Sequence, residues 1–357
     1  MKVSIVDTSP VPAGSTAVEA FRTTQELAAL ADQAGYSRYW LSELHGVPTN
    51  AGTAPEVGVT AVASRTSNLR VGSGCVLLNH RSPYRVAETF VQLHAMFPGR
   101  IDLGVGRATC GPLIDFALQH DRSGVLAEES YEGKIVELMQ WFDGFHDRHP
   151  FAQVPFYAGV AGRPEPWILG ATPVSAFVAA RFGMRYCFAA FLNPAEAQVS
   201  LATYRREFSP SEFKTGLANA YSMVAINVVC AETEGQALRV QAAGELVRRL
   251  EASGSLSDGV PSAADAIDQL GGLPEPTHYV RGSWRRSVAA APERLRELLE
   301  AMVAEVQADE LMIQDLIAAP ADRLTSYRLI AEVFDLRGSA PRPAATAAPS
   351  GADATAR

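Results

Sequence analysis

A glutamate and a histidine stand two residues apart, at Glu43 and His45, directly after an apolar run. A carboxylate and an imidazole at this spacing can orient one another and exchange protons near neutral pH, so they are candidates for general acid and base catalysis. The structural alternative is a glutamate buried against an arginine, with His45 simply hydrogen-bonded. Cys75 adds a thiol, although an isolated cysteine is more often a small buried apolar residue than a nucleophile.

A second set of residues is suited to binding an anion. Segment 170–175 is rich in small residues, carries hydroxyls at Thr172 and Ser175, and precedes a helical stretch. Free backbone N–H groups and the helix dipole at such a start favour a phosphate. Arg107, at the end of another strand-like run, could supply a planar charged fork to the same group. Alternatively, Thr172 only caps its helix and Arg107 makes a surface ion pair.

Short strand-like runs alternate with helical segments and would position these residues. The eight runs are residues 3–6, 38–42, 69–78, 100–105, 167–170, 185–191, 221–230 and 310–314. Thr16 and Glu19 have capping-box spacing, and Gly35 suits the end of the first helix. Eight strands, each followed by a helix, are typical of a (β/α)₈ TIM barrel. The alternative, a doubly wound sheet, needs a glycine-rich fingerprint where this chain has residues 7–10, DTSP.

In a TIM barrel the chemistry lies on the loops that follow the strands, so the candidates above should converge at one end. Three other segments are predicted to lie outside the strands: a helix at 127–142, a loop rich in Pro, Gly and His at 144–162, and an insertion loop at 271–287. The Ala/Pro/Thr/Ser composition near the end of the chain predicts a barrel domain over 1–336 and a disordered tail over 337–357.

The composition excludes several other classes of protein. Of 357 residues, 47% are hydrophobic, and the formal net charge is −8 with scattered Lys and Arg, which argues against nucleic acid as a partner. The N-terminus does not resemble a signal peptide, and no stretch approaches the roughly 18 apolar residues of a membrane helix. The four cysteines form no CxxC pair, and the seven histidines show no metal-ligand spacing. We therefore expect a cytoplasmic protein without a metal or membrane partner.

Several motifs together resemble the bacterial luciferase-like flavin-dependent monooxygenases. The resemblance covers about residues 1–335, and its block at 98–107 is the most specific. The motifs are 9–16 (SPVPAGST), 39–45 (YWLSELH), 54–57 (APEV), 70–76 (RVGSGCV), 98–107 (PGRIDLGVGR) and 309–313 (DELMI), followed by Arg323, Leu324, Ser326 and Tyr327.

This resemblance implies a TIM barrel, usually a homodimer, that binds reduced FMN or, in one branch, a deazaflavin. By residue-for-residue correspondence, Arg107 matches the family's phosphate-binding arginine, and Ala171, Thr172 and Ser175 fall in the loop that holds the same phosphate. The family usually has serines where this chain has Ala171 and Pro173. Gly74 and Cys75 match a pair that often carries a non-proline cis peptide beneath the flavin ring.

One position departs from the family pattern. The usual Glu-His-His is here Glu43-Leu44-His45, and the first histidine is the one that assists proton transfer at the flavin. His45, Cys75 or His80 could take over, the chemistry could need no base there, or the protein could have lost catalysis.

The sequence thus predicts a two-component monooxygenase that uses reduced FMN, delivered by a separate flavin reductase, and O₂. The apolar Leu44 and nearby aromatic side chains suggest an apolar or aromatic organic substrate, such as a secondary metabolite. Trp284 is one such aromatic residue, and Arg281, Arg285 and Arg286 of the insertion loop could reach an anionic substrate or the flavin phosphate, or could simply be solvated. The alternatives are a deazaflavin-dependent oxidoreductase and a non-catalytic flavin-binding or dimer-partner subunit.

Overall fold

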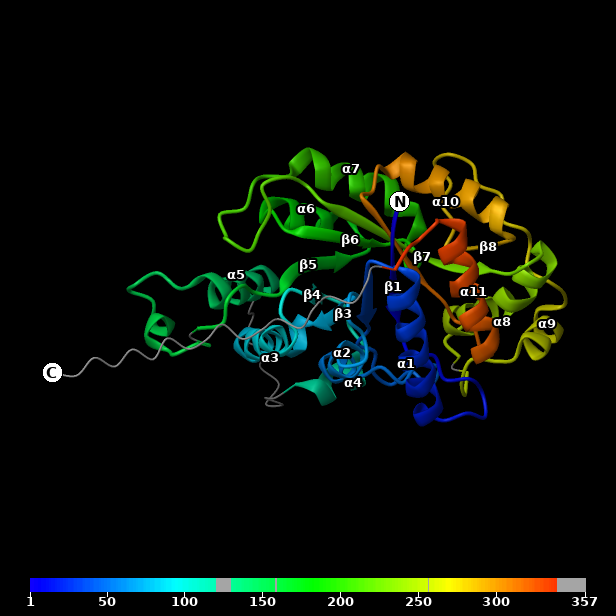
Figure 1. Ribbon diagram of the computed structural model, residues 1–357, viewed down its shortest axis with the longest axis horizontal. Coiled ribbons are helices and arrows are strands. Elements are labelled where there is room, and N and C mark those ends of the chain that lie inside the picture. The colour runs from blue at the N-terminus through cyan, green and yellow to red at the C-terminus, as the bar shows by residue number, and fades with distance from the viewer. Residues whose placement is uncertain (120–129, 158, 256, 339–357) are drawn as a thin grey trace.

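A closed barrel of eight parallel strands forms the centre of the protein (Figure 1). The computed structural model describes residues 1–119, 130–157, 159–255 and 257–338. The barrel closes because β6 pairs with β7 and β9 pairs with both β7 and β1. The barrel strands are β1 (Lys2–Asp7), β2 (Arg38–Leu41), β3 (Arg70–Leu77), β4 (Ile101–Gly106), β5 (Glu165–Gly170), β6 (Arg185–Ala189), β7 (Ser222–Cys230) and β9 (Glu310–Gln314). The predicted TIM barrel is confirmed.

Helices in the connections between strands cover the outside of the barrel. They are α1 (Ala17–Ala34), α2 (Pro55–Ala63), α3 (Pro83–Met96), α4 (Pro112–Leu118), α5 (Tyr131–Asp143), α6 (Pro173–Arg181), α7 (Ala197–Glu207), α10 (Pro292–Val306) and α11 (Pro320–Val333). Single 3₁₀ turns, η1 (Leu78–His80), η2 (Pro150–Gln153) and η3 (Pro194–Glu196), lie in the loops. The predicted start and end of α1 are confirmed, since Thr16 and Glu19 form a capping box and Gly35 is left-handed.

The long connection between β7 and α10 differs from the prediction in one strand. It contains α8 (Glu234–Ala252), α9 (Ala263–Leu270) and a ninth strand, β8 (Ser287–Ala290), which pairs with the end of β7. In Figure 1, α8 and α9 lie on one side of the barrel and α5 lies on the opposite side. The sequence predicted only a loop up to Ser287, because a strand of four residues gives almost no periodic signal.

The other differences concern the segment after β4. The short helix α4 was not predicted, and α5 begins at Tyr131 rather than at 127, with 127–129 outside the described residues. Of the predicted tail, 339–357 also lie outside them. Residues 337 and 338 pack against the end of α1, close to Gly35 and Gln33. No described helix has the length and hydrophobicity that a membrane crossing requires.

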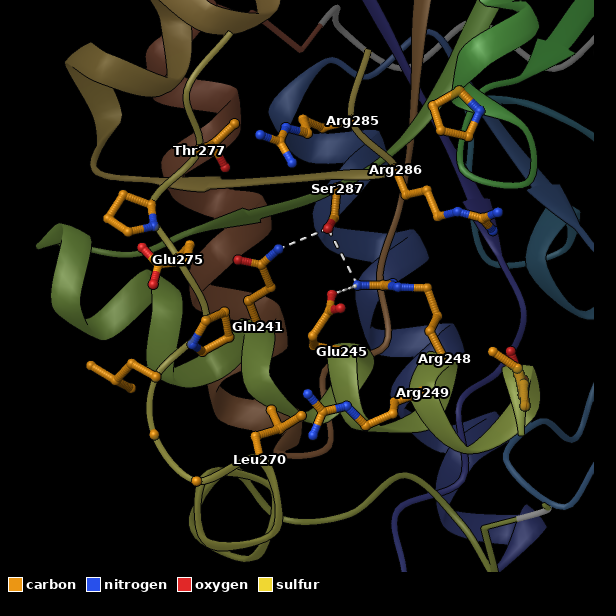
Figure 2. A pocket seen from close by; sticks show the side chains of 18 of the residues that line it. Gln241, Glu245, Arg248, Arg249, Leu270, Glu275, Thr277, Arg285, Arg286 and Ser287 are labelled. Atoms are coloured by element: carbon orange, nitrogen blue, oxygen red, sulfur yellow. Dashed lines mark hydrogen bonds and ion pairs between the residues drawn. The ribbon is translucent and has the colours of Figure 1, made fainter. Parts of the chain in front are cut away.

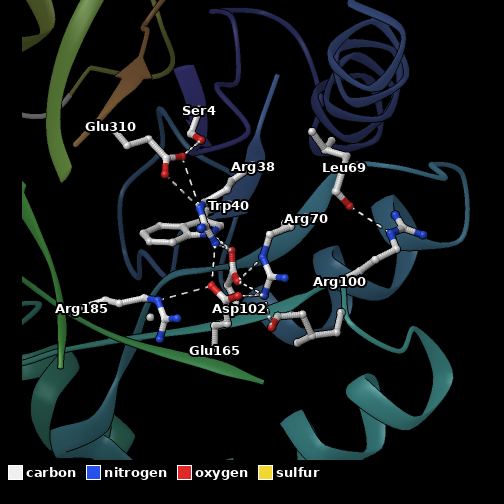
Figure 3. A network of polar contacts seen from close by, with 12 residues as sticks. Ser4, Arg38, Trp40, Leu69, Arg70, Arg100, Asp102, Glu165, Arg185 and Glu310 are labelled. Atoms are coloured by element: carbon white, nitrogen blue, oxygen red, sulfur yellow. Dashed lines mark hydrogen bonds and ion pairs between the residues drawn. The ribbon is translucent and has the colours of Figure 1, made fainter. Parts of the chain in front are cut away.

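Buried ion pairs close the end of the barrel where the strands begin (Figure 3). Arg38, the first residue of β2, lies 2.8 Å from Asp102 and 3.2 Å from Glu310, and Arg70 lies 2.6 Å from Asp102. Burial by itself would raise the pKa of Asp102, but the charges of Arg38 and Arg70 lower it below its ordinary value. Trp40 packs edge-on against Trp167 inside the barrel, 5.1 Å between ring centres. Access from this end is blocked, so a ligand must enter where the strands finish.

A second buried network joins α11 to the outside of the barrel. Arg323 lies 2.7 Å from Asp7 and 2.9 Å from Asp315, and Tyr39 donates its hydroxyl to Asp7. The resemblance motif that contains Arg323 therefore has a structural explanation here. Its aromatic neighbour Tyr39 is fully buried in this network and does not line a site.

Candidate active site

Glu43 follows β2 and is held on all sides at the open end of the barrel. Arg81 donates to Oε1 through Nε at 3.1 Å and Nη2 at 2.8 Å, and the backbone N–H of Leu77 donates to Oε2 at 3.0 Å. His45 Nε2 lies 3.1 Å from Oε1, while only 1% of the Glu43 side chain is exposed. These contacts match the structural alternative for Glu43, a carboxylate paired with an arginine that holds the loop after β2 on β3.

His45 is more accessible, with 18% of its side chain exposed. Its ring can pass a proton outward from its second nitrogen while Glu43 orients the first. A second histidine, His80, comes from η1 after β3, and its Nε2 lies 3.2 Å from Oδ1 of Asp115 on α4. The open end thus holds two histidines, each beside a carboxylate, and either arrangement is suited to proton exchange.

Cys75 lies at the centre of β3 and follows a cis peptide bond, Gly74–Cys75. The predicted cis peptide is therefore present. The side chain occupies the space beside Gly106, where an added Cβ would collide with the Cys75 sulfur. Burial and the nearby Glu43 carboxylate raise the pKa of Cys75 to about 12. At neutral pH Cys75 is therefore a thiol and not a thiolate nucleophile.

Tyr131, the first residue of α5, brings a phenol to the same place. Its hydroxyl is buried and has no hydrogen-bond partner among the described residues. Burial raises the pKa of Tyr131, Cys75 adds to the rise, and the charge of Arg107 opposes it, so the phenol lies close to both. A buried polar atom without a partner is unusual and indicates room for a ligand atom or a water.

Arg107 follows β4 directly and is exposed. Because Val105 of β4 pairs with Ile168 of β5, the end of β4 lies beside the turn that begins at Gly170. Within the described part of the chain, the Arg107 guanidinium has no ion-pair partner, so the alternative of a surface ion pair does not apply there. An arginine at this strand end, next to the strand that leads into a helix start, is available for an anion.

Thr172 and Ser175 form a capping box at the start of α6. The Thr172 hydroxyl accepts from the Ser175 backbone N–H at 3.4 Å, and the Ser175 hydroxyl donates to the Thr172 carbonyl at 2.7 Å. Asn193 fixes the turn by donating to the Ala171 carbonyl at 3.1 Å. Capping is thus one role of these hydroxyls, and the capped first turn has the positive end of the helix dipole, next to the strand that leads to Arg107.

Comparison with known proteins agrees with the barrel fold. The family model for luciferase-like monooxygenases matches residues 1–319. The chain belongs to the luciferase-like monooxygenase family. It is similar to a luciferase-like monooxygenase of Escherichia coli strain K12, with 34% identity over 338 residues, which cover 92% of this chain and 96% of that protein.

Two solved structures have the same fold. Apo-MsnO8 is 36% identical with a TM-score of 0.83, and the match covers 96% of this chain and 99% of that one. The oxygenating constituent of the Pseudomonas putida 3,6-diketocamphane monooxygenase, solved with FMN, has a TM-score of 0.66 at 17% identity, over 93% and 97% of the two chains. At that identity the second likeness concerns the fold alone. Family membership and the monooxygenases among the relatives support an oxidoreductase.

In this member of the family, the structure brings the predicted residues together at one end but pairs them with residues to which sequence reasoning gave no role. Arg81 and Asp115 lie 38 and 35 residues from the side chains they contact, and Tyr131 follows a segment outside the described residues. The one available signal was that Arg81 and His80 follow β3 directly, at the end of the barrel where polar residues gather.

Proposed function

We propose that this protein is a two-component flavin-dependent monooxygenase that uses reduced FMN and O₂ to oxygenate an apolar or aromatic organic substrate. Family membership supports the reaction class. The observation that carries the cofactor proposal is that the Arg107 guanidinium and the nearby Tyr131 hydroxyl have no partner among the described residues, at the end of the strand that lies next to the one leading into α6. The phosphate of a flavin mononucleotide could bind the Arg107 guanidinium. Its polar ring or ribityl atoms could form a hydrogen bond with the Tyr131 hydroxyl.

The residues present therefore fit this cofactor. Arg107 and the start of α6 would hold the phosphate, and Cys75 and Tyr131 would lie against the rest of the molecule. Reduced FMN, when bound, supplies the electrons that activate O₂.

The chain's own side chains would orient the reactants and move protons. Glu43 is engaged by Arg81 and Leu77, so we assign it a positioning role: it fixes the His45 ring. His45 would accept or release a proton at the open end in place of the histidine that Leu44 replaces. The half-buried Cys75 would contribute contact rather than nucleophilic attack, given its raised pKa.

This proposal includes a separate flavin reductase and a homodimer as partners. The experiment is an anaerobic titration of the purified protein with reduced FMN and, separately, with a reduced deazaflavin, followed by admission of O₂. We expect tight binding of reduced FMN and an O₂ reaction whose spectrum and rate differ from those of free reduced FMN. Binding of the deazaflavin alone would contradict the proposal, and binding of neither would favour a non-catalytic subunit.

A further inference from the structure

A cavity of about 1130 Å³ lies between α8 and the segment that leads from α9 to β8 (Figure 2). Its size is sufficient for a small organic molecule. Side chains of α8 form one wall, the 271–277 segment and residues 284–287 form the others, and Pro194 from the loop after β6 completes it.

The cavity belongs to the open end of the barrel. Ser287, which lines it, pairs with Asn227 near the end of β7. The first turns of α8 pack on the same end, since Ala237 clusters with Val229 of β7 and Ala289 of β8. The cavity is therefore on the rim around which Arg107 and His45 also lie, and a molecule bound in it is on the side where the proposed chemistry takes place.

Positive charge exceeds negative charge in the lining, which includes four arginines and three glutamates. Arg248 is engaged, at 2.8 Å from Glu245 and 3.3 Å from the Ser287 hydroxyl. The guanidinium groups of Arg249 and Arg285 have no hydrogen-bond or ion-pair partner among the residues that the structure describes. Unpaired guanidinium groups in a cavity are suited to a carboxylate, sulfonate or phosphate.

Gln241 gives the cavity a second, independent feature. Only 8% of this residue is exposed, and its Nε2 donates to the Ser287 hydroxyl at 2.7 Å. Its Oε1 is buried and has no partner in the described part of the chain. In Figure 2, Oε1 points away from Ser287 into the space between α8 and the 271–277 segment, on the side to which Arg249 and Arg285 also point. A bound hydroxyl or N–H donor would satisfy this oxygen.

The remaining wall is apolar. Trp284 is 7% exposed, and its indole N–H donates to Glu305 at 3.0 Å, which fixes the ring. Leu270 and Leu273 lie in the same lining. An apolar body can pack here while a polar end reaches Gln241 or a guanidinium.

We propose that this cavity binds the organic substrate, and that the substrate is an amphiphilic anion: an apolar or aromatic body, a hydrogen-bond donor to Oε1 of Gln241, and an anionic group held by Arg249 or Arg285. The proposal rests on the proposed monooxygenase function and specifies its substrate class. It also gives a role to one of the insertion-loop arginines: Arg285 faces the ligand, whereas Arg286 points to the other side of Ser287 (Figure 2).

The test is isothermal titration calorimetry of the full-length protein with 6-hydroxy-2-naphthoate, 2-naphthoate and 2-naphthol. These probes share the aromatic body and differ in the carboxylate and the donor. We expect the hydroxynaphthoate to bind most tightly. Arg249→Gln and Arg285→Gln together should weaken its binding at least tenfold without changing the affinity for 2-naphthol, and Gln241→Leu should weaken the hydroxynaphthoate more than 2-naphthoate.

Arg281→Gln is the matched control, because Arg281 lies on the same segment but not in the cavity lining. It should bind all three probes like the wild type. Failure of the hydroxynaphthoate to bind, or equal binding by the wild type and the double arginine variant, would overturn the proposal. Reduced FMN binding is measured in parallel, and its absence alongside intact, arginine-dependent naphthoate binding would overturn the proposed monooxygenase function while supporting anion recognition in the cavity.

Discussion

The Arg81 guanidinium holds one carboxylate oxygen of Glu43 with two of its nitrogens, at 3.1 and 2.8 Å. This contact joins the end of β3 to the loop after β2. The other terminal nitrogen of Arg81, Nη1, donates to Glu56 on α2 at 2.8 Å. The loop that carries His45 is therefore anchored by a buried charge pair, and the position of His45 depends on Arg81.

Replacement of Arg81 should reveal this dependence as a loss of stability. Arg81→Ala leaves the Glu43 carboxylate buried without its cation, so we expect a loss of about 3 kcal/mol in the free energy of unfolding, measured in urea. Arg85→Ala is the control, because its side chain is 74% exposed, and it should cost less than about 1 kcal/mol. Equal losses in the two variants would rule out the anchoring role.

Arg107 should be important for cofactor binding and not for stability. Arg107→Ala should weaken the binding of reduced FMN by more than about tenfold, because it removes the cation proposed for the phosphate. The free energy of unfolding should stay within about 0.5 kcal/mol of the wild type. The control is Arg206→Ala, which replaces an exposed arginine on α7. It should change neither the FMN affinity nor the free energy of unfolding. An unchanged FMN affinity in Arg107→Ala would exclude the phosphate role.

Tyr131→Phe separates a ligand-binding hydroxyl from a structural one. The hydroxyl has no partner among the described residues, so its removal should leave stability unchanged or raise it by about 1 kcal/mol, whereas reduced FMN should bind roughly three- to tenfold more weakly. Tyr84→Phe is the comparison, because that hydroxyl donates to Glu88 at 2.8 Å on α3. A variant at Tyr131 that is less stable but binds FMN normally would contradict the assignment.

Cys75 should be chemically inert in the folded protein. With a pKa of about 12, roughly one thiol in ten thousand is ionised at pH 8, so iodoacetamide should leave Cys75 unmodified there. Labelling should increase as the pH approaches 11 and should be complete in urea at pH 8. Mass spectrometry of the digested protein measures the labelling. Rapid labelling of Cys75 in the folded protein at pH 7 would show that it can act as a nucleophile.

The Asp7–Arg323 pair should determine how stability responds to acid. Burial by itself would raise the pKa of Asp7, but the charge and hydrogen bond of Arg323 lower it below 3.8. Ionised Asp7 therefore stabilises the fold above pH 4, and this contribution disappears as the pH falls through the lower pKa of the folded state.

In Arg323→Met the cation shared by Asp7 and Asp315 is gone, while burial and the hydrogen bonds from Tyr39 and the Ser9 backbone N–H remain. Burial is the largest influence on the pKa of Asp7, so this pKa should rise above its ordinary value. The variant should be about 3–5 kcal/mol less stable at pH 7 and should lose stability as the pH rises from 4 to 7. Arg328→Met, at an exposed position on the same helix, should follow the wild-type profile in urea. Parallel profiles for all three proteins would disprove the linkage.

The barrel could be predicted from the chain itself because each strand is a short apolar run bounded by turn residues and followed by a helical segment. The location of the site followed from the barrel, since strand ends gather the loops that carry Glu43, Arg107 and Thr172. These signals are local in the sequence, so they can be recognised without knowing which residues contact one another in the fold.

Only the tertiary structure decided what those residues contact. The pairing of Glu43 with Arg81 depends on the register of β2 on β3. The hydroxyls of Thr172 and Ser175 form a capping box, whereas the sequence alone was equally consistent with their binding a phosphate. The cavity beside Gln241 exists because β8 pairs with β7 and holds the 271–286 segment over α8. Side chains far apart in sequence meet because of helix packing and strand register, and local propensity predicts neither of these.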